Sequence, residues 1–198
     1  KLYNQGMILG ENNEKMSKEA MENIQRYLER DNVVALGEIG FDDITSQEED
    51  ILKQQLILGN ELGCPIIVHT PHINKLEGTK RTFEIIEETG VEQTRIIVDH
   101  NTEETIELSK SYEVFSGITV YPDTKLNPIR AVNIIKKYGI ENILINSSAD
   151  WGKSDPLSVP KTALYMENEG FSENEIEKLL YNNPESFLKK SRNYKIHN

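Results

Sequence analysis

The feature that most constrains this chain is an alternation of short apolar runs with longer amphipathic stretches. Each run is almost continuously apolar, as expected for a parallel strand that is covered on both faces. Strand–helix–strand repetition predicts a parallel sheet with right-handed crossovers. The strong runs are 33–36, 65–68, 95–98 and 142–145, and the weaker ones are 114–120 and 7–9.

Helix signals fill the segments between these runs. Ser17 is a suitable N-cap, Thr45 or Ser46 is suitable for a second helix, and Pro128 fits the first turn of another. Gly63 and Gly90 follow periodic stretches and are suited to end them. The predicted helices are 17–28, 46–62, 80–88, a short one after Thr102, 128–138, 160–169 and 173–180, with a final turn from Pro184.

Composition limits the class of protein. The 198 residues are 37% hydrophobic and 28% charged, which is typical of one globular domain, here expected to be residues 1–198. Apolar runs stay well below the roughly 18–20 residues that a membrane span needs. The single cysteine, Cys64, excludes an internal disulfide framework and a multi-cysteine zinc site, so we expect a cytoplasmic protein. The net charge of −11 disfavours binding to long duplex DNA.

Each strong run is followed closely by a side chain that can bind a metal ion: Glu38, His69, His100 and Asp150. In a parallel α/β barrel the C-terminal ends of all strands share one rim, so residues far apart in sequence converge there. Carboxylate and imidazole ligands suit Zn²⁺, Mn²⁺ or another divalent ion. Such an ion acidifies water, and a further carboxylate can take the proton. The spacing therefore predicts a metal site at this rim.

Two neighbouring positions need separate interpretation. Asp99 and His100 are consecutive, so their side chains should point to opposite sides of the strand, and we expect His100 to face the centre. His72 lies in the loop after the second strong run. It can orient a substrate there, and a purely structural position on a surface loop fits the sequence equally well.

These residues together resemble the TatD family of metal-dependent hydrolases, within the amidohydrolase-like superfamily. The resemblance covers about 33–188 and is closest to the EboC-like branch. Its family-wide motifs are Gly37-Glu38-Ile39-Gly40, Pro65-Ile66-Ile67-Val68-His69, the strand that ends in His100, the loop with Asp150, and Asn182-Asn183-Pro184. The stretches closest to the branch are 69–72, 99–105 and 146–152.

The resemblance implies a TIM-type (β/α)₈ barrel that holds one or two divalent cations, Zn²⁺, Mn²⁺ or Mg²⁺. Glu38 would contact or bridge the ions, and His69 and His100 would be imidazole ligands. Asp150 would be both the last ligand and the general base. TatD enzymes are associated with hydrolysis of phosphodiesters in DNA. The implied function is attack of metal-activated water on a phosphodiester or related ester or amide bond of a small molecule or short nucleic acid.

One departure from the family pattern matters. The family has a His-x-His pair on its first strand, whereas the four histidines here are His69, His72, His100 and His197. Barrels of this type take about 250 residues, so we expect a barrel that is N-terminally truncated and incomplete. Two alternatives therefore stay open: a catalytically impaired scaffold or binding subunit, and a metal-free enzyme that uses Glu38 and a histidine as acid and base.

Overall fold

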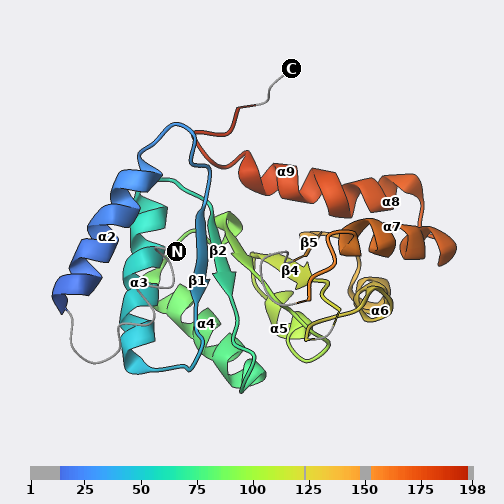
Figure 1. The fold of residues 1–198 in the computed structure, drawn as a ribbon, viewed down its shortest axis with the longest axis horizontal. Coiled ribbons are helices and arrows are strands. Elements are labelled where there is room, and N and C mark those ends of the chain that lie inside the picture. The colour runs from blue at the N-terminus through green and yellow to red at the C-terminus, as the bar shows by residue number, and fades with distance from the viewer. Residues whose placement is uncertain (1–13, 123, 148–152, 196–198) are drawn as a thin grey trace. The chain divides into compact units, whose positions relative to one another are not determined.

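The computed structural model describes residues 14–122, 124–147 and 153–195 (Figure 1). The chain divides into two compact units, one formed by 1–96 with 187–198 and the other by 97–186. The single domain over residues 1–198 stays a prediction.

The first unit contains a parallel pair of strands with helices packed on it. Strand β1 runs parallel to β2, with Ile39 opposite Val68 and Gly40 opposite His69. Helix α3 packs against β1, β2 and α4, and it buries Leu52 and Leu56. The elements are α2 (Glu14–Leu28), β1 (Leu36–Gly40), α3 (Ser46–Glu61), β2 (Ile66–His69), α4 (Lys75–Thr89) and η1 (Gln93–Arg95).

Three predicted starts in this unit were wrong. Helix α2 begins at Glu14, so Ser17 lies inside it and is not its N-cap. Strand β1 begins at Leu36 rather than at residue 33, because pairing starts where β2 starts, with Leu36 opposite Ile66. Glu38 therefore lies inside the strand and not after it. Helix α4 begins at Lys75 rather than at residue 80. The first turn of α4 therefore precedes the predicted start, and the Thr79 hydroxyl donates to the Lys75 carbonyl oxygen at 2.7 Å.

The second unit contains three parallel strands. Strand β4 lies between β3 and β5, with Val98 opposite Ser116 and Thr119 opposite Asn146. A buried cluster that includes Ile118 and Ile135 fills its core. The elements are β3 (Ile96–Val98), α5 (Ile106–Ser109), β4 (Phe115–Thr119), α6 (Pro128–Tyr138), β5 (Ile143–Asn146), α7 (Ser158–Asn168), α8 (Glu173–Glu177), the π-helical turn η2 (Lys178–Asn182) and α9 (Asn183–Leu188).

Several predictions for the second unit are confirmed. The weaker run 114–120 forms β4, whose five residues are all buried. Helix α6 has the predicted bounds, and its N-cap, Asn127, accepts a hydrogen bond from the Arg130 backbone N–H at 3.0 Å. The predicted strand at 7–9 lies outside the described residues.

The Asn-Pro segment has a structural role in this unit. The buried amide of Asn183 donates to the carbonyl oxygens of Ile140 and Ile143, at 2.8 and 2.6 Å. These two carbonyl groups flank the turn that leads into β5. Asn183 therefore attaches the last helix to the start of this strand.

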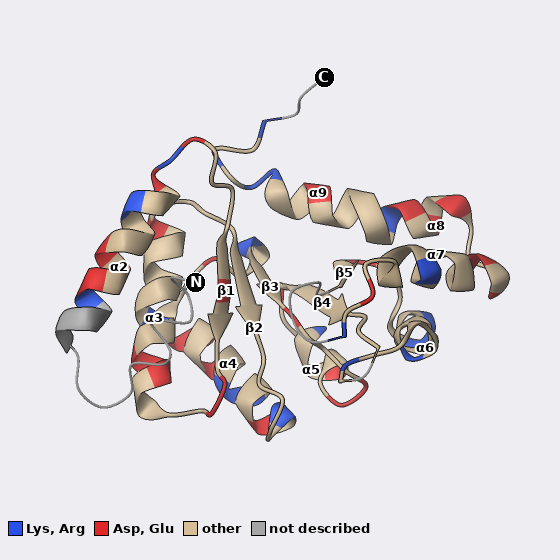
Figure 2. Ribbon diagram, in the orientation of Figure 1, with Lys and Arg blue, Asp and Glu red and all other residues tan. Residues whose placement is uncertain are grey.

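Charged side chains are distributed over the helices, and acidic residues are conspicuous on α3 and α8 (Figure 2). Within the described residues, every helix is too short or too polar to cross a membrane.

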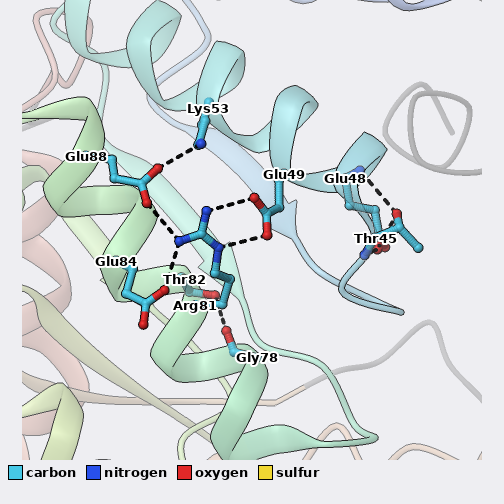
Figure 3. Close-up of polar contacts among 9 residues, drawn as sticks. All are labelled: Thr45, Glu48, Glu49, Lys53, Gly78, Arg81, Thr82, Glu84 and Glu88. Atoms are coloured by element: carbon cyan, nitrogen blue, oxygen red, sulfur yellow. Dashed lines mark hydrogen bonds and ion pairs between the residues drawn. The ribbon is translucent and has the colours of Figure 1, made fainter.

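An ion-pair network joins α3 and α4 of the first unit (Figure 3). The Arg81 guanidinium on α4 makes a two-pronged contact with Glu49 on α3, with both N–O distances 2.8 Å. Its remaining nitrogen contacts Glu84 and Glu88 on its own helix, also at 2.8 Å. Hydrogen bonds to Glu49, Glu84 and Glu88 raise the pKa of Arg81 above its ordinary value. Planar, paired bonding of this kind is specific to arginine.

We expect Arg81→Met to lower the free energy of unfolding by about 1 kcal/mol, because it removes the link between α3 and α4 at a partly exposed site. The loss should be smaller at high salt, where exposed ion pairs are screened. Urea denaturation at low and high NaCl measures both effects. Lys80→Met, at the exposed neighbouring position, is the matched control. Equal losses in the two variants would contradict a specific role for Arg81.

Candidate metal centre

Two of the predicted ligands lie on the strand pair of the first unit. Gly40 is opposite His69 across the pair, and Glu38 lies two residues before Gly40. The register with β2 shifts between Leu36 and Ile39, so Glu38 lies in an irregular part of β1. Glu38 is exposed, whereas His69 is only 9% exposed. Adjacent strands of this unit therefore contribute a carboxylate and an imidazole.

The His69 ring depends on a close approach of the neighbouring strand. A Cβ atom at Gly40 would lie 2.1 Å from the His69 carbonyl oxygen and 2.6 Å from the ring carbon Cδ2. Gly40 also has a φ of +147°, which a residue with a side chain rarely adopts. The second glycine of Gly37-Glu38-Ile39-Gly40 therefore makes room for the histidine of the next strand.

A partly buried carboxylate organises the loop after β1. Glu48 accepts hydrogen bonds from the backbone N–H groups of Asp42 and Thr45, both at 2.8 Å, and of Asp43 at 3.2 Å. It forms a capping box with Thr45 at the start of α3. Burial raises the pKa of Glu48, but the bonds from Thr45, Asp42 and Asp43 outweigh burial and hold this pKa below its usual value. The loop brings an Asp42 carboxylate oxygen to 4.0 Å from His69 Nε2.

A lysine holds the loop after β2. The Lys75 ammonium group donates to the Thr70 hydroxyl at 2.9 Å and to the Pro71 carbonyl oxygen at 3.1 Å. His72 follows directly and is exposed. Its side chain is therefore carried by a loop that is fixed at its beginning.

In the second unit, Asp99 joins the ends of three strands. It follows β3 and is 4% exposed. Its Oδ1 accepts bonds from the His100 backbone N–H at 2.6 Å and from the Thr119 hydroxyl of β4 at 3.1 Å. Its Oδ2 accepts a bond from the Asn146 amide of β5 at 2.8 Å. Burial raises the pKa of Asp99, but the nearby His100, its N–H, Asn146 and Lys125 together hold the pKa below its usual value.

Space for Asp99 comes from a glycine on β4. A Cβ atom at Gly117 would lie 2.3 Å from Asp99 Oδ1. The following Asn101 is fixed to the same place, because its amide donates to the carbonyl oxygens of Val98 and Gly117, at 2.7 and 3.2 Å. The turn after β3 is therefore closely packed against β4.

His100 occupies this turn in a left-handed backbone conformation, with φ +63°. Its ring is buried, and Nδ1 lies 2.7 Å from the Thr119 hydroxyl oxygen. The Lys125 ammonium lies 3.0 Å from Nδ1 and 2.9 Å from Nε2. An atom this close to both ring nitrogens does not lie on the axis of either lone pair, so Lys125 sits beside the ring. A cationic group and a hydroxyl therefore flank the imidazole.

Comparison with known proteins decides the family. A model of the family described as TatD related DNase matches residues 10–189. The chain belongs to this family. An uncharacterized metal-dependent hydrolase of Methanocaldococcus jannaschii is 36% identical over 168 residues, which are 84% of this chain and 65% of that relative. The chain thus spans just under two thirds of the length of this relative.

Solved structures agree with this TatD assignment. A TatD-like protein from Archaeoglobus fulgidus has 32% identity and a TM-score of 0.67, with 85% of this chain and 65% of that chain covered. The Escherichia coli phosphotriesterase homology protein, solved with phosphate in its active site, has 17% identity and a TM-score of 0.70, with 86% and 66% covered. The second likeness concerns the fold alone. Together they confirm the predicted TIM-type barrel class.

The predicted site residues of this TatD-family chain fall in both units. Glu38 and His69 lie on adjacent strands in the first unit, and His72 follows His69 in a surface loop. His100 lies at the end of β3 in the second unit, and Asp150 lies outside the described residues. Taken by donor type alone, the carboxylate and imidazole groups that each unit contains are those that a divalent cation such as Zn²⁺ or Mn²⁺ requires.

Sequence reasoning missed the residues that hold His100 in place. The expectation that Asp99 and His100 point to opposite sides was wrong, because both follow the end of β3 and both contact the Thr119 hydroxyl. Thr119, Asn146 and Lys125 were also not among the predicted residues. Thr119 and Asn146 are the last residues of β4 and β5. A signal was present, because these polar residues end apolar strands as the predicted ligands do.

We expect Glu48→Gln to lower the free energy of unfolding at pH 7 by about 1 kcal/mol, since the capping box loses an acceptor oxygen. Because the folded pKa of Glu48 lies below the unfolded one, its contribution is complete above the unfolded pKa, about 4.3. The contribution is lost as the pH falls through the folded pKa. Denaturation of both proteins from pH 7 to pH 3 should show the difference shrinking with acidity.

Glu61→Gln, at an exposed position at the end of the same helix, is the control for this experiment. A difference between wild type and Glu48→Gln that stays constant down to pH 3 would show that the Glu48 charge has no part in the capping.

We expect Gly117→Ala to displace Asp99 and to cost about 1–3 kcal/mol of stability, because the new methyl group has no room. Gly170→Ala is the comparison, since its Cβ would meet nothing within 4 Å although its φ of +89° also carries strain. NMR signals of the His100 ring should move in the first variant only. Unchanged His100 signals in Gly117→Ala would refute the close packing.

Proposed function

We propose that this chain carries most of the ligand set of a TatD-family metal-dependent hydrolase. In this proposal Glu38, His69, His100 and Asp150 hold one or two divalent cations. The observation that carries it is the buried His100 ring, which follows β3 and contacts the Thr119 hydroxyl at the end of β4. The chain that holds it belongs to the TatD family. The name of the M. jannaschii relative, a metal-dependent hydrolase, supports the same class of function.

The proposed chemistry is hydrolysis. A divalent cation, when bound, supplies Lewis acidity that polarises the bond to be cleaved and lowers the pKa of water. Asp150 acts as the general base and takes a proton from the attacking water. Glu38 contributes negative charge that offsets the charge of the ions. His72, exposed next to the loop that Lys75 fixes, contacts the substrate.

We propose a phosphodiester or related phosphoester as the substrate. The phosphate in the active site of the E. coli relative supports a phosphorylated ligand. The net charge of −11 argues against long duplexes, because a polyanion is repelled by most of such a surface. Bound cations would reverse the charge locally. A small phosphoester or a short nucleic acid therefore fits better than long DNA.

The test is metal content and hydrolysis in the full-length protein. We expect wild type loaded with Zn²⁺ or Mn²⁺ to retain bound metal, measured by mass spectrometry, and to hydrolyse bis(p-nitrophenyl) phosphate. His100→Ala should lower metal affinity and activity by about a hundredfold or more. Loss of a group that only holds a metal ligand in place already lowers affinity or activity about 10–100-fold. Asp150→Asn should lose activity to a similar degree.

His197→Ala is the matched control, because this histidine is in none of the proposed roles. Wild type that binds no metal and cleaves no ester would favour a scaffold or binding subunit. Hydrolysis that persists in excess EDTA would favour metal-free acid–base chemistry. Either result would overturn the proposed function.

A further inference from the structure

The hydrogen bonds around His100 determine which ring nitrogen carries the proton. An ionised carboxylate only accepts hydrogen bonds, and a threonine hydroxyl has a single proton to donate. The Thr119 hydroxyl donates that proton to Asp99 Oδ1 at 3.1 Å. Its oxygen therefore acts as an acceptor toward His100 Nδ1, 2.7 Å away. Nδ1 must carry a proton, and in the neutral ring Nε2 therefore keeps its lone pair.

Lys125 does not distinguish the two tautomers, because its ammonium lies 3.0 Å from Nδ1 and 2.9 Å from Nε2 and is on the axis of neither lone pair. The contact with Thr119 does distinguish them. An unprotonated Nδ1 would leave two acceptors facing each other there, since the Thr119 hydroxyl donates its proton to Asp99.

The orientation is enforced by more than one contact. Asp99 cannot turn away from Thr119 freely, because its other oxygen holds Asn146 at 2.8 Å and its first oxygen holds the His100 N–H at 2.6 Å. Gly117 provides the space in which this carboxylate sits. Thr119 is itself 2% exposed, so water does not compete readily for its hydroxyl.

We propose that Thr119, oriented by Asp99, is a positioning residue that fixes the His100 ring with the Nε2 lone pair available to a cation. The part that concerns the cation rests on the proposed function, whereas the tautomer is a property of the metal-free protein. Metal-binding histidines commonly have their second nitrogen held by an oxygen acceptor, which sets the tautomer and the direction of the ring. Here the acceptor is the Thr119 hydroxyl, which donates its own proton to the buried Asp99 carboxylate.

The first experiment reads the tautomer directly. Metal-free protein labelled with ¹⁵N-histidine is examined by long-range ¹H–¹⁵N correlation, which distinguishes a protonated from an unprotonated ring nitrogen. We expect the wild-type His100 ring to show Nδ1–H with Nε2 unprotonated. Thr119→Val, which replaces the hydroxyl by a methyl group of similar size, should abolish this preference. Thr119→Ser keeps the hydroxyl and should restore it, while the His69 signals stay unchanged in both variants.

The second experiment measures affinity for Zn²⁺ by competition with a chromophoric chelator. We expect Thr119→Val to bind about 10–100-fold more weakly than wild type, the range typical of losing a group that is hydrogen-bonded to a metal-binding histidine, and Thr119→Ser to lie near wild type. Because a structural defect alone would not change the tautomer selectively, the two readouts together distinguish positioning from general destabilisation.

A wild-type ring with the proton on Nε2 would overturn the proposal, and this measurement needs no variant to fold. Folded Thr119→Val with an unchanged imidazole pattern would also overturn it. The proposed function fails separately. If Thr119→Val changes the tautomer while His100→Ala binds Zn²⁺ as wild type does, the positioning role is supported and His100 is not a ligand.

Discussion

The second unit depends on one buried carboxylate. Asp99 receives donors from its own turn, from Thr119 and from Asn146, and so connects the C-terminal ends of β3, β4 and β5. A carboxylate in this position is costly unless hydrogen-bond donors compensate its burial. The arrangement satisfies that demand and at the same time orders the end of the sheet where His100 lies. Asp99 therefore both connects the strand ends and orders the turn that contains His100.

The first unit also has a carboxylate that accepts several hydrogen bonds and orders the nearby backbone. Glu48 also collects several donors, but these are mainly backbone N–H groups of the loop after β1. It thereby shapes a loop, whereas Asp99 joins strands. Loops that follow parallel strands carry the reactive groups in barrels of this class, so their shape must be fixed by the scaffold. In both units a carboxylate that is not itself a proposed ligand supplies the order.

Much of this architecture could be predicted from the sequence, because parallel strands covered on both faces are nearly uniform in apolar residues. Periodicity and capping residues similarly placed α3 and α6. The start of β1 could not be found this way, since the register with β2, rather than local composition, decides it. Thr119 and Asn146 were missed for a related reason. Each is an ordinary polar residue in its own segment, and only pairing between strands brings both to Asp99.

The glycine opposite His69 affects how such proteins should be recognised. A histidine on one strand and the absence of a side chain on its neighbour form a single unit, although they lie far apart in the chain. A homologue that keeps the histidine but has a larger residue at position 40 would have to move its imidazole. A genome survey for competent members of the family should therefore treat the glycine as being as diagnostic as the ligand itself.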